Sequence, residues 1–148
     1  CFYGSGESVS YLNKLSREDS RIKYCGQVSF GQLQRIQQAA DLLVNPRPSN
    51  ESFSAYSFPS KTLSYMLSGT PVLTTRIPGI PSSYQPYLLW FDGEDTDSMA
   101  KRIEEIMNTP PAQLKEIGKR AYTYARDEKN SLAQSARLLS FAECEIHE

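Results

Sequence analysis

Short apolar runs alternate with amphipathic stretches along this chain, and the alternation predicts its elements. Runs of strand length stand at 41–45, 71–75 and 87–91, each bounded by proline or polar residues. Apolar residues at three- and four-residue steps predict the helices between and after them, over 59–68, after Asp95 or Asp97, from Thr109-Pro110 to Tyr124, and over 130–143. This order is typical of an α/β fold, with a Rossmann-like, mostly parallel sheet and helices on both faces.

The first forty residues carry shorter signals of the same kind. Residues 1–3 and 22–25 look like strands that end at glycines, with a helix between them. Ser29 and Gln32 have the spacing of a capping box, which predicts the start of a helix with Leu33, Ile36 and Ala40 on one face. Because the chain opens inside a predicted strand, we expect residues 1–148 to be one domain cut from a larger protein.

The composition fits one folded domain and limits the partners that it can have. The 148 residues are 39% hydrophobic and 11% aromatic, which favours folding over disorder. The net charge of −1 gives no field for binding nucleic acid. Residues 1–80 hold 8 Lys and Arg against 5 Asp and Glu, which favours an anionic ligand there, although sampling alone explains the excess equally well.

Cysteine and histidine usage narrows the possible chemistry. The three cysteines are scattered without the spacing of a disulfide framework or a zinc site, which favours a reducing, cytoplasmic location. The single histidine, His147, leaves no credible Ser-His-Asp arrangement. The chain shows neither a signal peptide nor an apolar run long enough to cross a bilayer.

The best candidate site follows the strand at 41–45, since ligands of parallel sheets bind beyond the carboxyl ends of strands. The polar stretch 47–57 is the longest connection, and the helix after it leaves the N–H groups of Ser60 and Lys61 without intrahelical partners. Lys61 adds a positive charge, and Ser57 adds a hydroxyl group. The alternative is a well-capped helix with a solvated lysine.

Further residues around this helix are weaker candidates. Arg47 directly follows the strand and has the reach to bind an anion; Glu51 in the loop is a hydrogen-bond acceptor for hydroxyl groups. The alternatives are a solvated glutamate, which is the more frequent case for a loop carboxylate, and a surface arginine with its stem packed on the loop. On the helix, Leu63, Met66 and Leu67 should face the sheet, whereas Lys61, Ser64 and Ser68 form a separate polar stripe.

Two motifs carry a resemblance to a known family. They are the run Ala40-Asp41-Leu42-Leu43-Val44-Asn45-Pro46 and the block Phe58-Pro59-Ser60-Lys61-Thr62-Leu63-Ser64-Tyr65-Met66-Leu67-Ser68-Gly69-Thr70-Pro71-Val72-Leu73, with Pro78-Gly79-Ile80-Pro81 behind them. They resemble the donor-binding half of GT-B glycosyltransferases of group 1, in particular the retaining enzymes that build bacterial exopolysaccharides. The resemblance runs from Phe2 to about Met107.

The resemblance implies a domain that holds a nucleoside diphosphate sugar without a metal or other cofactor. Its diphosphate would lie on Lys61, Ser60, Ser57 and Arg47. Ser64 falls where many relatives have a glutamate that binds the ribose. The second family glutamate falls on Tyr56, so that Glu51 is the nearest carboxylate for the donor sugar. Gln27 and Val28 lie where relatives place the nucleobase.

The resemblance also implies sugar transfer to a hydroxyl group of a glycan or lipid-linked glycan, in polysaccharide or glycoconjugate synthesis. A missing N-terminal domain would bind this acceptor and would associate peripherally with the inner face of the membrane. The isolated domain would then be inactive, and no catalytic residue is assignable. A non-catalytic Rossmann-shaped module and a sugar-nucleotide epimerase domain stay open as alternatives.

Overall fold

A computed structural model of the chain describes residues 1–145. It consists of two compact units, Cys1–Ile36 and Gln37–Glu148, and each is described by itself. The boundary between them falls inside helix α2 (Phe30–Ala39). The second unit holds the sheet and most of the residues singled out above.

The sheet of the second unit is parallel and has the order β1-β2-β3. Its strands are β1 (Leu43–Asn45), β2 (Val72–Thr74) and β3 (Leu89–Trp90), with Asn45 opposite Thr74 and Thr74 opposite Trp90. Val72 and Leu73 alternate across β2, and each belongs to a different buried cluster. Both faces of the sheet are therefore covered, which confirms the predicted α/β class.

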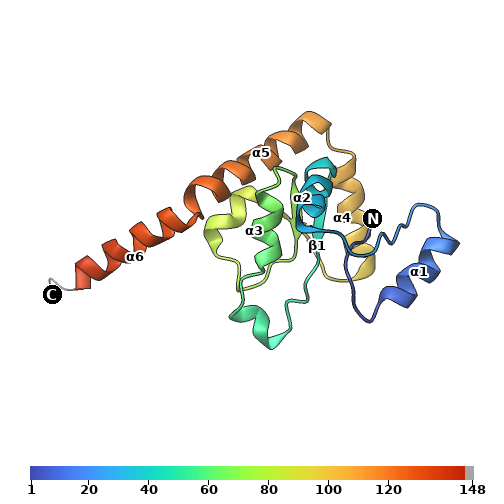
Figure 1. Cartoon of the computed structure of the whole chain (residues 1–148), viewed down its shortest axis with the longest axis horizontal. Helices are drawn as coiled ribbons and strands as arrows, with labels where there is room; N and C mark the ends of the chain where they lie inside the picture. Colours follow the sequence, from blue (N-terminus) through green and yellow to red (C-terminus); the bar gives the residue numbers. More distant parts are fainter. Residues whose placement is uncertain (146–148) are drawn as a thin grey trace. The chain divides into compact units, whose positions relative to one another are not determined.

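Different helices cover the two faces. Helices α3 (Ser60–Met66) and α5 (Pro111–Glu128) contribute Met66, Ala121 and Ala125 to the cluster around Val72. Helix α4 (Thr96–Met107) contributes Ile106 to the cluster around Leu73. Figure 1 shows α5 running alongside α3, in keeping with the contacts between these helices.

The prediction of a strand from Tyr87 is wrong at its start. Residues Ser82–Tyr87 form the 3₁₀ helix η2, and only Leu89 and Trp90 pair with β2. Pro86 lacks an N–H group for a ladder, and the Trp90 side chain donates from Nε1 to the Gln85 carbonyl oxygen at 3.2 Å. That bond folds the preceding segment back onto β3. The other two strands are also shorter than the apolar runs that predicted them.

Helix α3 departs from its prediction at both ends. Pro59 is the residue before the helix and has an extended conformation, and the helix ends at Met66, before Ser68. Leu67 is 43% exposed and does not face the sheet; the fully buried residues of α3 are Thr62 and Met66.

The sequence left two candidates for the cap of α4, and the structure selects one. Asp95 rather than Asp97 caps α4, since its carboxylate accepts the Ser98 N–H at 2.9 Å.

The last helix, α6 (Ser131–Glu145), forms as predicted, but its apolar stripe is not buried. Leu132, Ala136 and Leu139 are exposed. Figure 1 shows α6 extending beyond the end of α5, and Arg137 of α6 pairs with Glu128 of α5 at 2.7 Å. Within residues 1–145, no helix is long and apolar enough to span a membrane.

The first unit contains α1 (Val9–Glu18) and the beginning of α2. The two predicted strands reduce to one parallel bridge between Phe2 and Tyr24. The capping box is confirmed, because the Ser29 N–H donates to Gln32 Oε1 at 2.9 Å and the Gln32 N–H returns to Ser29 Oγ at 3.4 Å. Helix α2 ends at Ala39, one residue before the predicted Ala40.

A close approach of two backbones fixes α5 on the sheet. A Cβ atom on Gly118 of α5 would overlap the Gly69 carbonyl oxygen and lie 3.0 Å from the Pro71 backbone nitrogen. Gly69 has a φ of +78°, which suits glycine, and it follows α3 on the way to β2. Only glycine at position 118 lets α5 pack this closely.

We predict that Gly118→Ala lowers the free energy of unfolding by about 1–3 kcal/mol, because the methyl group must push α5 away from Gly69. Gly31→Ala is the matched control, since Gly31 is also helical but has nothing within 4 Å of the added Cβ. It should leave stability unchanged or raise it by up to about 1 kcal/mol. Urea unfolding measures both, and equal effects of the two substitutions would contradict the packing account.

A second prediction concerns alkaline pH. Burial and the neighbouring Tyr124 raise the pKa of Tyr84 to about 12, although Arg137 acts in the opposite direction. In the unfolded state this tyrosine ionises near pH 10, about two pH units below the folded state. Between these values the proton is released only by the unfolded state, which is thereby stabilised relative to the folded state. The free energy of unfolding should therefore fall between pH 10 and 12. Tyr84→Phe should make this fall shallower than in the unmodified protein when urea unfolding is followed across this pH range; identical slopes for the two proteins would refute the assignment.

Candidate functional site

A buried polar network joins the carboxyl ends of β1 and β2 to the first turn of α3. The Asn45 side chain donates from Nδ2 to Thr62 Oγ1 at 3.2 Å. The backbone carbonyl oxygen of Asn45 accepts from Thr74 Oγ1 at 3.0 Å. All three side chains are buried, so each needs these partners in place of water. The network sets the position of the start of α3 against the sheet.

The long connection between β1 and α3 is held at several points. Within it, residues Ser52–Ala55 form the 3₁₀ helix η1. The Arg47 N–H donates to Thr75 Oγ1 at 3.1 Å, and the buried Ser54 hydroxyl donates to the Pro48 carbonyl oxygen at 2.9 Å. The Ser49 N–H donates to Glu94 Oε2 at 3.0 Å, and hydrogen bonding from the Ser49 side chain, together with this backbone bond, lowers the pKa of the Glu94 carboxyl.

The loop after β2 packs against η1 without room for a side chain. The Gly79 N–H donates to the Ser54 carbonyl oxygen at 2.9 Å. A Cβ atom on Gly79 would lie 2.7 Å from that oxygen and would overlap the Ser57 carbonyl oxygen. Position 79 therefore requires glycine, because any side chain would overlap the Ser57 backbone. The loops that follow β1 and β2 are in direct contact at the carboxyl edge of the sheet.

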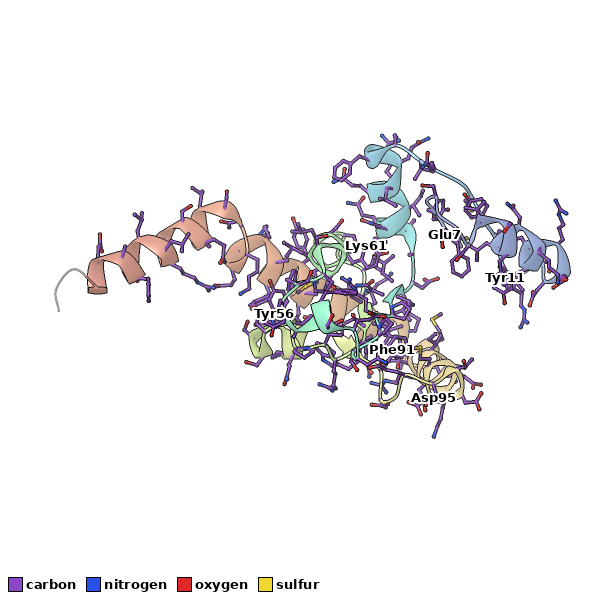
Figure 2. All side chains as sticks on the ribbon, turned by 90° about the horizontal axis from the view of Figure 1, so that it is seen from below. Glu7, Tyr11, Tyr56, Lys61, Phe91 and Asp95 are labelled. Carbon is purple, nitrogen blue, oxygen red and sulfur yellow. The ribbon has the colours of Figure 1, made fainter. Side chains whose placement is uncertain are left out.

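Lys61 stands at this edge in the first turn of α3 (Figure 2). Its side chain is exposed, and no carboxylate among residues 1–143, whose side chains the structure describes, pairs with it. Ser60 is exposed beside it, and Ser57 is half-buried in the preceding loop. The fixed start of α3 therefore presents an unneutralised positive charge to solvent.

Two arginines follow β1 and β2 at the same offset. Arg47 comes two residues after Asn45, and Arg76 comes two residues after Thr74. Each guanidinium lies over an aromatic ring, with Arg47 Cζ 5.3 Å from the Phe53 centroid and Arg76 Cζ 4.8 Å from the Trp90 centroid. Neither arginine has an ion pair within the described part of the chain. Sequence reasoning missed Arg76, although its offset from a parallel strand was a usable signal.

The remaining predicted residues differ in their surroundings. Glu51 is exposed immediately before η1, and its side chain makes no capping bond. Ser64 is half-buried on α3. Ser68 of the predicted polar stripe donates to the Tyr65 carbonyl oxygen at 2.6 Å, so its hydroxyl is engaged at the end of the helix.

Gln27 and Val28 lie in the first unit, between the bridge at Tyr24 and the start of α2, with Gln27 exposed and Val28 half-buried. Their role as nucleobase-binding residues stays a prediction. His147 lies outside the described residues. Among the side chains that the structure describes, residues 1–143, no group of three His, Cys, Asp or Glu is placed to hold a metal ion.

The parallel sheet with helices on both faces is a Rossmann-like α/β arrangement, consistent with one half of a GT-B fold, and in the described part of the chain Lys61, Arg47 and Arg76 near its carboxyl edge have no ion pair. The profile of the family described as glycosyl transferases group 1 matches residues 1–109. The chain therefore belongs to the group 1 glycosyl transferases. No curated protein matches it.

The polar network gives a prediction for stability. Thr62→Val keeps the shape of the side chain but leaves the buried Asn45 amide without its acceptor, so we expect a loss of about 1–3 kcal/mol in the free energy of unfolding. Thr62→Ser keeps the hydroxyl group and should cost less. Thermal or urea unfolding compares the two variants, and a Thr62→Val protein as stable as the original would show that the network does not hold α3.

Proposed function

We propose that this chain is the donor-binding domain of its glycosyltransferase and holds a nucleoside diphosphate sugar at the carboxyl edge of the sheet. The observation that carries the proposal is Lys61: it is exposed, it has no ion pair within residues 1–143, and it is set beside β1 by the Asn45–Thr62 bond. An ammonium group held in this way favours a phosphate oxygen. Membership of the family makes a nucleotide sugar the natural source of that phosphate.

The proposed chemistry uses this charge in the bond-breaking step. The bond between the sugar C1 and the diphosphate oxygen breaks, an acceptor hydroxyl oxygen bonds to C1 and loses its proton, and the diphosphate leaves with added negative charge. Lys61 stabilises that charge in the transition state more than in the bound donor, which is how fixed charges accelerate such reactions. Its loss should lower the transfer rate by about 10²-fold.

The other residues take their proposed roles from the family resemblance and from their positions along the chain. Ser60, Ser57 and Arg47 contact the diphosphate, and Arg76 adds a further positive charge at the same edge. Ser64 faces the ribose, Glu51 the donor sugar, and Gln27 with Val28 the nucleobase. The transfer is of the retaining type, needs no metal, and serves polysaccharide or glycoconjugate synthesis. A further domain supplies the acceptor site and the contact with the cytoplasmic membrane face.

The test is a calorimetric titration of UDP and GDP into the chain and its variants. Lys61→Ala should weaken binding of the preferred diphosphate about tenfold or more, since hydrogen bonds to charged groups contribute about 1.5–3 kcal/mol. Lys101→Ala removes an exposed lysine from α4 and is the matched control, with no change expected. Binding that is equally strong in Lys61→Ala, or equally weakened by Lys101→Ala, would argue against the proposed site.

A further inference from the structure

A turn at Ser49 and Asn50 separates Arg47 from Glu51, the residues proposed to bind the diphosphate and the donor sugar. Among the hydrogen bonds of the described residues, one joins this turn to another segment of the chain: the Ser49 N–H donates to Glu94 Oε2 at 3.0 Å. Glu94 follows β3 and lies 45 residues further along the chain. The position of the turn therefore depends on a carboxylate from a distant loop.

The backbone that carries Glu94 is fixed on the side of α4. Glu94 lies between Phe91 and Asp95, both labelled in Figure 2. A Cβ atom on Gly93 would lie 2.9 Å from Ser98 Cβ, so Gly93 packs directly on the first turn of α4. Asp95 caps the same helix by accepting the Ser98 N–H. Because both neighbours of Glu94 are held in this way, the bond positions the turn rather than Glu94.

The bond itself lies at the surface of the second unit. Glu94 is exposed and Ser49 is half-buried, and neither belongs to a buried cluster. Hydrogen bonding from the Ser49 side chain and backbone lowers the pKa of the Glu94 carboxyl, which is therefore ionised at neutral pH. A charged acceptor strengthens the bond, but the core does not depend on it. Loss of the bond should free the turn without unfolding the protein.

Arg47 and Glu51 differ in how far they depend on this turn. Arg47 has two anchors of its own: its N–H donates to Thr75 Oγ1, and its guanidinium lies over the Phe53 ring. The Glu51 carboxylate has no hydrogen bond or ion pair within residues 1–143, so the backbone around it alone sets its direction. A displaced turn should therefore misplace Glu51 more than Arg47.

We propose that Glu94 is a positioning residue for recognition of the donor sugar: by holding the turn, it orients Glu51 for contact with that sugar. This inference rests on the proposed function and extends its site to the loop after β3. Without the bond, the turn occupies its binding position for only part of the time, and the apparent affinity falls by that fraction. The diphosphate, held by Lys61 and Arg47, does not share this loss.

The experiment uses calorimetry with the unmodified chain and its variants to compare two affinities. One is that of UDP or GDP, and the other is that of UDP-glucose, UDP-galactose, UDP-N-acetylglucosamine or GDP-mannose. Glu94→Ala should weaken binding of the preferred nucleotide sugar about fivefold, as for a turn that is in place about one fifth of the time, and should leave the affinity of the diphosphate unchanged. A merely structural role would lower both affinities together, which would overturn the proposal.

Two further variants test the chemistry of the bond. Glu94→Gln keeps an oxygen that accepts the Ser49 N–H, so it should retain most of the affinity for the nucleotide sugar. Glu104→Ala is the matched control, because it removes an exposed carboxylate from α4 that has no hydrogen bond or ion pair within residues 1–143. It should leave both affinities unchanged, and a loss equal to that of Glu94→Ala would mean that only net charge matters and would refute the positioning role.

Amide hydrogen exchange tests the same bond without a ligand. Glu94→Ala should speed the exchange of the Ser49 amide, whereas the Ser54 amide, which donates to the Glu51 carbonyl oxygen within η1, should keep its rate. A Ser49 amide that exchanges at the same rate in both proteins would show that Glu94 does not hold the turn.

These outcomes separate the inference from the donor site itself. If UDP or GDP binds through Lys61 and Glu94→Ala leaves the affinity of every nucleotide sugar unchanged, the donor site stands and the positioning role fails. If neither the diphosphates nor the nucleotide sugars bind the unmodified chain, the donor site and the positioning role fail together.

Discussion

The buried Asn45 side chain links the three elements on which the site depends. It bonds α3 through Thr62, and its backbone carbonyl oxygen receives the hydroxyl of Thr74 from β2. A strand of three residues has few backbone bonds of its own, so these side-chain bonds determine where α3 begins relative to the sheet. The exposed Lys61, one residue before Thr62, is positioned as a consequence. A polar network that is fully satisfied in this way specifies one arrangement, because any slip leaves a buried group unpaired.

The longer helices and the three strands of the sheet were predictable from the sequence, whereas their ends, the 3₁₀ helices η1 and η2, and the reduction of the strands at 1–3 and 22–25 to one bridge were not. Apolar periodicity identified α4 and α5 because their buried residues recur at helical steps. It misplaced Leu67 and Tyr87, whose positions depend on contacts with distant parts of the chain: α3 stops before Leu67, and the Trp90 side chain folds η2 back. It also predicted an apolar stripe on α6, and this stripe is exposed. Local pattern reports which residues gain by burial, but not whether a partner surface covers them.

The candidate site was predictable where a motif and a strand end coincide. Lys61, Ser60 and Arg47 all follow from the rule that ligands gather beyond the carboxyl ends of parallel strands. Arg76 follows from the same rule once β2 is located, yet no motif drew attention to it.

The central claim is that a nucleoside diphosphate binds at the edge organised by Asn45. The most direct measurement is an amide-resolved NMR titration of the chain with UDP, GDP and AMP. The account predicts that one diphosphate shifts the amide signals of residues 57–64 and of the loop after β1 most strongly, with AMP far weaker, while signals of α6 stay in place. Shifts that avoid residues 57–64 with every nucleotide, or that are the same for AMP as for both diphosphates, would contradict it.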